Sequence, residues 1–151
     1  MNVHRFNIRV YGLLVHAGHV LVSDELVHGK RITKFPGGGM ELGEGTLQCL
    51  VREVREEMGA EAMDLQHFYT TDFFQPSAFR KGDQIISIYY TFRVARIDGA
   101  DAGLRPFVDH AESGESFRWL PLDQAGPADV DLPIDRVVLG MLIQEFHGAE
   151  A

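Results

Sequence analysis

The chain has 151 residues, of which 45% are hydrophobic and 24% are charged, and its net charge is −8. This length and composition are typical of one globular domain with a substantial core, so we expect residues 1–151 to form a single domain. The negative charge argues against a nucleic-acid polymer as partner, because a phosphate backbone needs clustered Lys and Arg. It does not exclude a small phosphate-bearing ligand whose charge a metal ion offsets.

No targeting or membrane segment is predicted. Residues 1–10 contain His4, Arg5 and Arg9 without an apolar run, which argues against a signal peptide. No apolar stretch approaches the roughly 20 residues that span a bilayer. The single cysteine, Cys49, cannot form an internal disulfide and suits a reducing compartment. We therefore expect a cytoplasmic protein that does not contact membranes.

The first third of the chain predicts strands. Phe6–Val15 alternates and then runs apolar, which indicates a strand partly buried on both faces. A turn at His16–His19 leads into a short strand at Val20–Ser23. Arg31–Phe35 predicts a further strand, and the run Pro36–Gly39 after it predicts a loop.

Thr46–Met58 predicts the clearest helix of the chain. Thr46 is a suitable N-cap, and Gly59 is a natural C-terminal stop. Apolar residues recur along this segment at helical spacing: Leu47, Leu50, Val51, Val54 and Met58.

The second half of the chain predicts strands followed by a helix. Long strands are expected at His67–Phe74 and Gln84–Ile97, with a polar loop at Pro76–Asp83 between them. Asp98–Gly114 predicts an irregular acidic loop, and Ser116–Leu120 predicts a short final strand.

A C-terminal helix is expected to begin at Pro133. Its predicted buried stripe consists of Ile134, Val137, Val138, Met141, Leu142 and Phe146. The order of strands, helix, strands and helix indicates a mixed α/β sandwich.

Three glutamates on the first predicted helix form a candidate metal site. Glu56 and Glu57 follow Glu53 by three and four residues, so the carboxylates lie on one side of the helix. Hard oxygen ligands of this kind favour Mg²⁺, with Mn²⁺ as the alternative. Arg52 can reach Glu56 one turn away. Three glutamates alone favour a solvated acidic helix face, because exposed charge is the common case.

The segment before this helix changes that reading. Phe35–Gly45 is rich in glycine, which allows a ligand to approach the main chain closely, and Glu44 lies just ahead of the helix. From Gly38 to Ala60 the chain resembles the Nudix box, G-x5-E-x7-R-E-U-x-E-E-x-G-U, where U is bulky and aliphatic. Ala60 is the one departure. A chance match of the charged and glycine positions is on the order of 10⁻⁸ from average residue usage.

The resemblance implies a fold and a reaction. Members of the Nudix family have an α/β/α sandwich around a mixed β-sheet, and they use divalent cations to hydrolyse nucleoside diphosphates linked to another moiety. The flanking runs Arg31–Gly39 and Phe117–Leu122 are also similar to the family. We therefore expect Mg²⁺-dependent attack of water on phosphorus in a substrate such as ADP-ribose or a nucleotide sugar.

Carried over by position, the resemblance assigns roles within the box. Glu53, Glu56 and Glu57 would be metal ligands, with Glu44 as a supporting ligand and Arg52 orienting the carboxylates.

The resemblance does not assign the general base to a single residue. In the family it is either a box glutamate or a carboxylate of the loop before the last strand, where this chain offers Asp109, Glu112 and Glu115. Glu115 is preferred because it lies nearest the predicted strand.

Residues outside the box would bind the rest of the substrate. Arg31, Lys34, Arg80 and Lys81 are candidates for phosphate contacts, although each is also compatible with a solvated surface charge. Gly38 and Gly39 would let the substrate approach the backbone. Aromatic residues that could stack on a base, or pack in a core or interface, are Phe35, Phe73, Phe74 and Phe79.

Several alternatives remain open. Pro76 lies sixteen residues after the box, as in the ADP-ribose-hydrolysing subgroup, but an ordinary turn is the favoured explanation of a single proline in a loop. A nucleoside triphosphate is the alternative substrate, and a nonhydrolytic nucleotide sensor is the alternative function. An isoprenoid-diphosphate isomerase would need a catalytic cysteine, whereas Cys49 lies among the apolar helix positions. Apolar strands and the last helix are compatible with a homodimer.

Overall fold

The computed structural model of the chain describes residues 2–95, 109–110 and 115–150. Most of the predicted Asp98–Gly114 loop therefore lies outside the described residues, as does Glu112. The strand predicted to reach Ile97 was too long, because it ends at Arg93. Asp109–His110 forms a two-residue strand, β7, which pairs with β8 (Glu115–Pro121).

The centre of the fold is a mixed sheet. Its strand order is β5 (Met63–Thr70), β6 (Asp83–Arg93), β1 (Arg5–His16), β2 (His19–Val27), β8 and β7. β3 (Lys30–Lys34) also pairs with β2, and β4 (Gly37–Gly39) with β1. β1 and β6 run parallel, and the other pairs are antiparallel.

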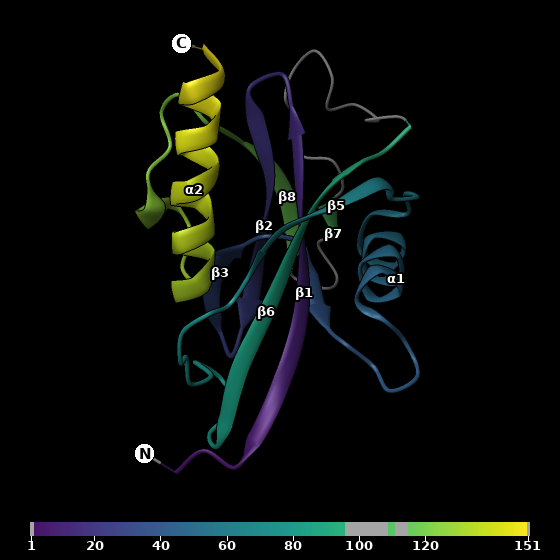
Figure 1. The fold of residues 1–151 in the computed structure, drawn as a ribbon, viewed down its shortest axis with the longest axis vertical. Coiled ribbons are helices and arrows are strands. Elements are labelled where there is room, and N and C mark those ends of the chain that lie inside the picture. The colour runs from purple at the N-terminus through teal and green to yellow at the C-terminus, as the bar shows by residue number, and fades with distance from the viewer. Residues whose placement is uncertain (1, 96–108, 111–114, 151) are drawn as a thin grey trace.

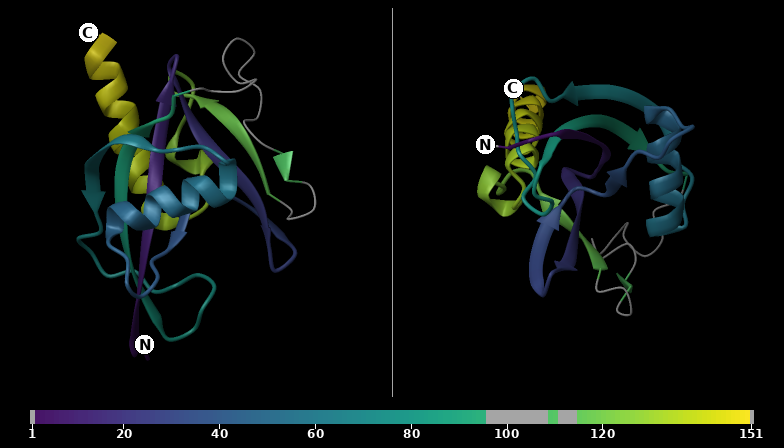
Figure 2. Two further views of the ribbon diagram at one scale, coloured as in Figure 1. Left: turned by 90° about the vertical axis from the view of Figure 1, so that its right-hand side faces the viewer. Right: turned by 90° about the horizontal axis from the view of Figure 1, so that it is seen from below.

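The two α-helices lie on opposite sides of this sheet. Figures 1 and 2 show α1 (Thr46–Met58) on one side and α2 (Pro133–Glu150) on the other. A short 3-10 helix, Pro127–Asp129, precedes α2. This arrangement confirms the predicted α/β/α sandwich around a mixed sheet. None of the helices in the described part of the chain is long and apolar enough to cross a membrane.

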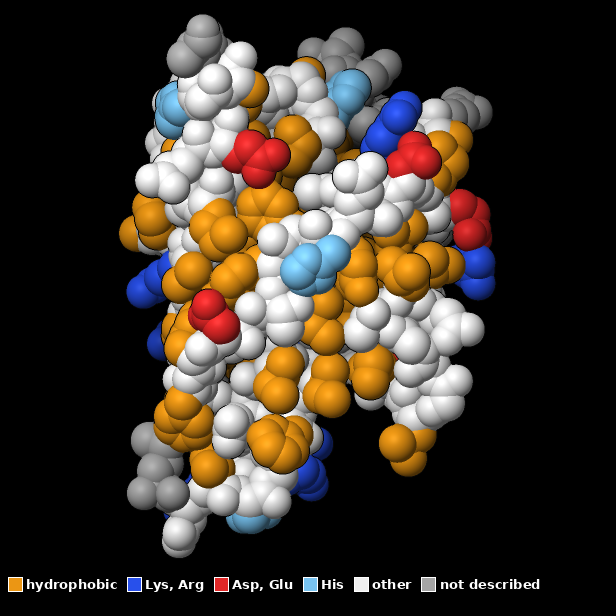
Figure 3. Space-filling view, in the orientation of Figure 1, with side chains coloured by type: hydrophobic (Ala, Val, Ile, Leu, Met, Phe, Trp, Pro, Cys, Tyr) orange, Lys and Arg blue, Asp and Glu red, His pale blue; other side chains and the backbone are white. Residues whose placement is uncertain are grey.

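Hydrophobic side chains also remain on the surface. Figure 3 shows them over the middle of one face, between the two helices, with Lys and Arg at its margins. The large exposed hydrophobic side chains of the chain include Phe6, Phe73, Phe74 and Phe79.

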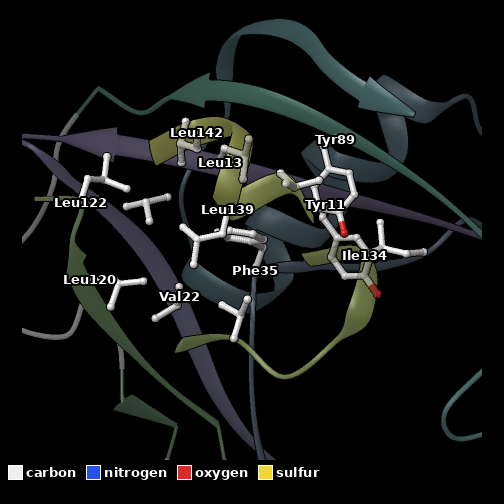
Figure 4. Packing of buried hydrophobic residues seen from close by; sticks show 13 residues of the cluster. Tyr11, Leu13, Val22, Phe35, Tyr89, Leu120, Leu122, Ile134, Leu139 and Leu142 are labelled. Carbon is white, nitrogen blue, oxygen red and sulfur yellow. The ribbon is translucent and has the colours of Figure 1, made fainter. Parts of the chain in front are cut away.

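Alternation along β1 supplies both layers of the core. Tyr11 and Leu13 pack with Val138 and Leu139 of α2, in the cluster that Figure 4 shows around Phe35. Val10 and Leu14 point to the opposite face of the sheet, where the second cluster includes Leu50 and Val54 of α1. The predicted strand buried on both faces is confirmed, because each face has its own helix.

The helix bounds agree closely with the prediction. α1 covers Thr46–Met58 and ends at Gly59 in the left-handed region, with φ of 65°. The N-cap prediction was wrong: Gly45 occupies that position, and its backbone N–H donates to Gln48 Oε1 at 2.6 Å. The Thr46 hydroxyl instead pairs with the hydroxyl of Tyr90.

The predicted buried stripes each contain errors. Leu47 is 49% exposed, whereas Cys49 is fully buried, as expected for a packing residue. Val137 is 42% exposed and Leu139 takes its place in the core. In both helices the buried face is rotated about the helix axis from the predicted one, so that one predicted residue is exposed and the residue two positions later is buried.

The strands differ from the prediction mainly in length. β2 continues to Val27 rather than ending at Ser23, because it pairs with β3 and β8 along this extension. β5 begins at Met63 and ends at Thr70, so Phe73 and Phe74 lie beyond it on the surface.

The glycine run is not only a loop. Gly37–Gly39 forms β4, which pairs with Arg9–Tyr11 of β1. A Cβ on Gly37 would lie 2.1 Å from the Val10 carbonyl oxygen, and its φ of 141° disfavours other residues. Glycine therefore lets this strand approach β1 closely and fixes the entry to the box.

Candidate active site

The charged and glycine residues of the box are concentrated where β4 meets α1. β4 brings the main chain of Gly37–Gly39 against the helix, and the helix directs its acidic side chains toward that strand. The two elements are linked by residues 40–45, which include Glu44. The acidic side chains of α1 thus lie against the backbone of β4, which consists of three glycines.

Arg52 makes hydrogen bonds to most of the charged groups of this region. Its guanidinium donates two hydrogen bonds to Glu44, at 2.7 and 3.0 Å, and one to the Gly39 carbonyl oxygen at 3.0 Å. It also donates to Glu53 at 2.9 Å and to Glu56 at 3.1 Å. The hydrogen bonds from Arg52 lower the pKa of Glu44 to about 2, so Glu44 is ionised at neutral pH.

Glu53 is packed against the glycine strand. Its side chain is only 14% exposed, compared with 57% for Glu56. A Cβ on Gly38 would lie 2.7 Å from Glu53 Oε1, so a side chain at position 38 would displace this carboxylate. Burial raises the pKa of Glu53, and Arg52 offsets only part of that effect.

Glu57 faces the same strand one turn further along α1. Its Oε2 accepts a hydrogen bond from the Gly37 backbone N–H at 3.2 Å. Burial, together with the nearby carboxylates of Glu115 and Glu53, raises the pKa of Glu57 to about 8, although Lys34 acts in the opposite direction. A carboxylate here is stabilised by added positive charge.

A second acidic group comes from the sheet. Glu115 of β8 lies opposite Glu25 of β2 and accepts a hydrogen bond from the Ser23 hydroxyl at 2.8 Å. Lys34 Nζ lies 3.4 Å from Glu25. Burial lowers the pKa of Lys34, but Glu57, Tyr11, Glu25 and Glu115 more than offset this, so the net pKa is raised. Lys34 is therefore a buried cation that pairs with Glu25 and is stabilised by the charges of Glu57 and Glu115.

The donor set fits a hard divalent cation. Among the described residues, no three His, Cys, Asp or Glu side chains form a ready-made metal cluster, because the carboxylates turn toward Arg52 and backbone N–H groups. The available donors are nevertheless all oxygens, as Mg²⁺ prefers. The raised pKa values of Glu53 and Glu57 indicate that a cation would relieve the cost of ionising them.

A cavity of about 630 Å³ is lined by Gly39 of β4 and Lys34 of β3, but by none of these glutamates. Its rim includes Phe79 and His28, whose rings are stacked with centroids 6.4 Å apart. Arg9, Lys34 and Arg80 provide positive charge. The cavity is large enough for a nucleotide-sized ligand.

The predicted substrate-binding residues are only partly brought together. Lys34, Gly39 and Arg80 line the cavity, whereas Gly38 is covered by Glu53. Arg31 does not line the cavity and is exposed on the strand that carries Lys34.

The other predicted candidates lie at different depths. Phe35 is fully buried in the core, while Phe73 and Phe74 are exposed outside the cavity lining. Pro76 lines the cavity beside Phe79. Asp109 lies in β7, and nothing is described of its side chain.

Two polar residues of the cavity were missed by the sequence analysis. Asp135 is fully buried and accepts hydrogen bonds from the Tyr89 hydroxyl and, at 3.2 Å, from the Phe35 backbone N–H. Burial raises its pKa to about 6. The sequence could have indicated the burial of Asp135, since it lies at helical spacing from the buried residues Val138, Leu139 and Leu142. The position of Arg9 could have been found in the same way, because Arg9, Tyr11 and Leu13 occupy alternate positions of β1 and so share one face of the strand.

Comparison with known proteins agrees with this architecture. The family model of the NUDIX domain matches residues 4–139. An NAD-capped RNA hydrolase, NudC, from Pseudomonas aeruginosa (strain LESB58) is 27% identical over 138 residues. That match covers 86% of this chain but 44% of the relative, so the chain spans less than half of the relative's length.

Solved structures share the fold. A NUDIX hydrolase from Nitrosomonas europaea superposes with a TM-score of 0.68 at 21% identity, covering 97% of this chain and 90% of that one. A MutT NUDIX hydrolase from Burkholderia pseudomallei gives a TM-score of 0.64 at 16% identity, covering 91% and 98%. At these identities the likeness is one of fold.

Proposed function

The chain belongs to the Nudix family, and on this premise we propose that it hydrolyses the phosphoanhydride bond of a nucleoside diphosphate linked to another moiety. Membership makes it a hydrolase of phosphorus-containing acid anhydrides. The proposal adds the substrate class, the Mg²⁺ requirement and the residues that act.

One observation carries this proposal. The carboxylates of Glu53 and Glu57 pack against the Gly37–Gly39 strand, and Gly39 of that strand lines a nucleotide-sized cavity together with the cation Lys34. A diphosphate can lie beside this strand with its linked moiety in the cavity. An acidic helix face that served only for solubility would be exposed rather than packed against a glycine strand.

The proposed ligands of the divalent cation are Glu53, Glu56 and Glu57, with Glu44 in support. When bound, Mg²⁺ or Mn²⁺ supplies charge neutralisation of the diphosphate and acidifies the attacking water. Arg52 positions Glu44, Glu53 and Glu56 through its fan of hydrogen bonds. Preorganised charge of this kind avoids reorganisation during the reaction.

Glu115 is the proposed general base. The Ser23 hydroxyl fixes one of its oxygens, and it belongs to the group that surrounds Lys34 and Glu57. A base must lie within hydrogen-bond reach of the water it deprotonates. Glu115 begins the strand after the acidic loop, and its carboxylate is near enough to Glu57 to raise the pKa of that residue. A box glutamate, Glu57, is the alternative.

The substrate class draws support from the relative in Pseudomonas aeruginosa. That protein is named a hydrolase of NAD-capped RNA. NAD is itself a nucleoside diphosphate linked to another moiety, so dinucleotides of this type join ADP-ribose and nucleotide sugars as candidate substrates. The net charge of −8 favours the small molecule over a polymer.

The cellular setting is part of the same proposal. A free, buried Cys49 suits a reducing compartment such as the cytoplasm. The exposed side chains of Phe6, Phe73 and Phe74 are compatible with a homodimer, which light scattering at micromolar concentration would detect.

A substrate panel tests the proposed function. Purified protein with Mg²⁺ would be offered ADP-ribose, NAD, nucleotide sugars, nucleoside triphosphates and dinucleoside polyphosphates, with products separated by chromatography. Selective release of two monophosphates from a diphosphate-linked compound would support the proposal. Selective release of pyrophosphate from a triphosphate would favour the alternative substrate class, and no turnover with cation bound would favour a nonhydrolytic sensor.

A further inference from the structure

Arg9 is a cavity-lining residue that the proposed reaction has not yet used. It lies in β1 directly opposite Gly39 of β4 and lines the 630 Å³ cavity. Its Nη1 atom lies 3.5 Å from the position that a Cβ on Gly39 would occupy. The guanidinium therefore lies close to the box strand, at the side of the cavity.

The guanidinium is held in one orientation by Tyr11. Arg9 Nε donates to the Tyr11 hydroxyl at 2.6 Å, and the guanidinium carbon lies 5.6 Å from the centre of the Tyr11 ring. Tyr11 itself is buried, so this support is rigid. Fixing Nε leaves the four N–H groups of the two Nη atoms as the free end of the side chain.

These N–H groups lack an ionic partner within the described part of the chain. Lys34 has Glu25 at 3.4 Å and Arg80 has Asp83 at 4.0 Å, whereas Arg9 makes no salt bridge to any described residue. Burial lowers the pKa of Arg9, but Tyr11 and the more distant Glu53 and Glu25 raise it overall, so it stays charged. A partly buried cation without a paired anion is costly unless a ligand supplies one.

We propose that Arg9 binds the substrate phosphate attached to the moiety that occupies the cavity. This inference rests on the proposed function and deepens it, because it assigns the two ends of the substrate. The planar fork of arginine matches two oxygens of one phosphate, which a lysine at this position would not do. The phosphate would lie between Arg9 and the box carboxylates, with its linked group extending toward Phe79 and His28.

Binding of inorganic pyrophosphate in the presence of EDTA tests this assignment without turnover. Isothermal titration calorimetry would compare the unaltered protein with Arg9→Gln and Arg9→Lys. We expect Arg9→Gln to weaken binding at least tenfold and Arg9→Lys to weaken it less, because lysine keeps the charge but loses the fork. Arg93→Gln is the matched control, since Arg93 is 75% exposed, pairs with Asp64 and lies outside the cavity lining; it should change the affinity less than twofold.

Steady-state kinetics on the substrate found by the panel provide a second readout. A contact made equally in the ground and transition states raises KM and leaves kcat nearly unchanged, so Arg9→Gln should raise KM at least tenfold. Near-ultraviolet circular dichroism would check that the variants are folded. If Arg9→Gln does not fold, the comparison of Arg9→Lys with the parent still tests the assignment.

The outcomes separate this inference from the proposed function. Unchanged pyrophosphate affinity in folded Arg9→Gln and Arg9→Lys would overturn the role of Arg9, even if the enzyme hydrolyses a diphosphate. A large loss of affinity in Arg9→Gln and a smaller loss in Arg9→Lys would support it, even if no member of the panel were hydrolysed.

Discussion

Replacement of Gly38 by alanine tests whether the packing of Glu53 against the glycine strand matters for turnover. The added Cβ would lie 2.7 Å from Glu53 Oε1 and 2.9 Å from Oε2. To restore an ordinary contact of 3.4 Å the carboxylate must move by about 0.7 Å. A misplacement of about 1 Å at a catalytic centre can cost on the order of 10²-fold in rate, so we expect kcat/KM to fall by roughly 30- to 100-fold.

The assay is steady-state hydrolysis with saturating Mg²⁺, accompanied by thermal melting of each protein. Gly39→Ala is the matched control, because its Cβ would meet Arg9 Nη1 at 3.5 Å, an ordinary contact. Neither glycine has a positive φ, so alanine adds no backbone strain at either position. We expect both variants to melt close to the parent, and Gly39→Ala to keep kcat/KM within about threefold.

The reasoning would be refuted by a folded Gly38→Ala protein with the parent's kcat/KM. In that case the observed position of Glu53 against Gly38 would not matter for turnover. Equal losses in Gly38→Ala and Gly39→Ala would also contradict it, because the two contacts differ by 0.8 Å.

Three further predictions concern charge. Glu57→Gln and Glu53→Gln should each lower kcat by orders of magnitude with little change in melting, since each removes a proposed metal ligand; full activity in both would reject the ligand assignment. EDTA should abolish turnover, and added Mg²⁺ or Mn²⁺ should restore it; activity that persists in EDTA would contradict the cation requirement. Asp135 has a folded-state pKa of about 6 against 3.8 for the ordinary group, so the folded protein holds this proton more tightly. Its contribution to the free energy of unfolding should therefore be greatest below pH 4 and fall by about 3 kcal/mol as the pH rises to about 6 and above. Urea titrations of the parent and Asp135→Asn from pH 4 to 7 measure this as a difference, and a difference independent of pH would show that Asp135 is not the group responsible.

The sequence predicted the layers of the fold because each layer has a strong local pattern. α1 is marked by apolar spacing and by Gly59, which adopts the left-handed conformation that ends the helix. The two-sided burial of β1 follows from its apolar run. By contrast, β4 could not be predicted from local pattern, because Gly37–Gly39 has no side chains to alternate. Its pairing with β1 depends on close backbone contact between distant segments.

The sequence could predict those contacts of the site that depend only on residue spacing within α1. Arg52 reaches Glu56 as helical geometry requires, but its bonds to Glu44 and the Gly39 carbonyl depend on how the loop folds back. Pairing of β2 with β8 brings Glu115 opposite Glu25, and no local pattern encodes this. The same holds for the burial of Lys34, whose surroundings come from three different strands and α1.

Hydrolysis in water enriched in ¹⁸O tests the central claim most directly. The best diphosphate-linked substrate would be turned over with Mg²⁺, and both products would be examined by mass spectrometry. Attack of water on phosphorus predicts two monophosphate products, with a single ¹⁸O in the phosphate of one of them. An ¹⁸O atom on carbon of the linked moiety, or products that retain the diphosphate, would show that another bond breaks and would contradict this account.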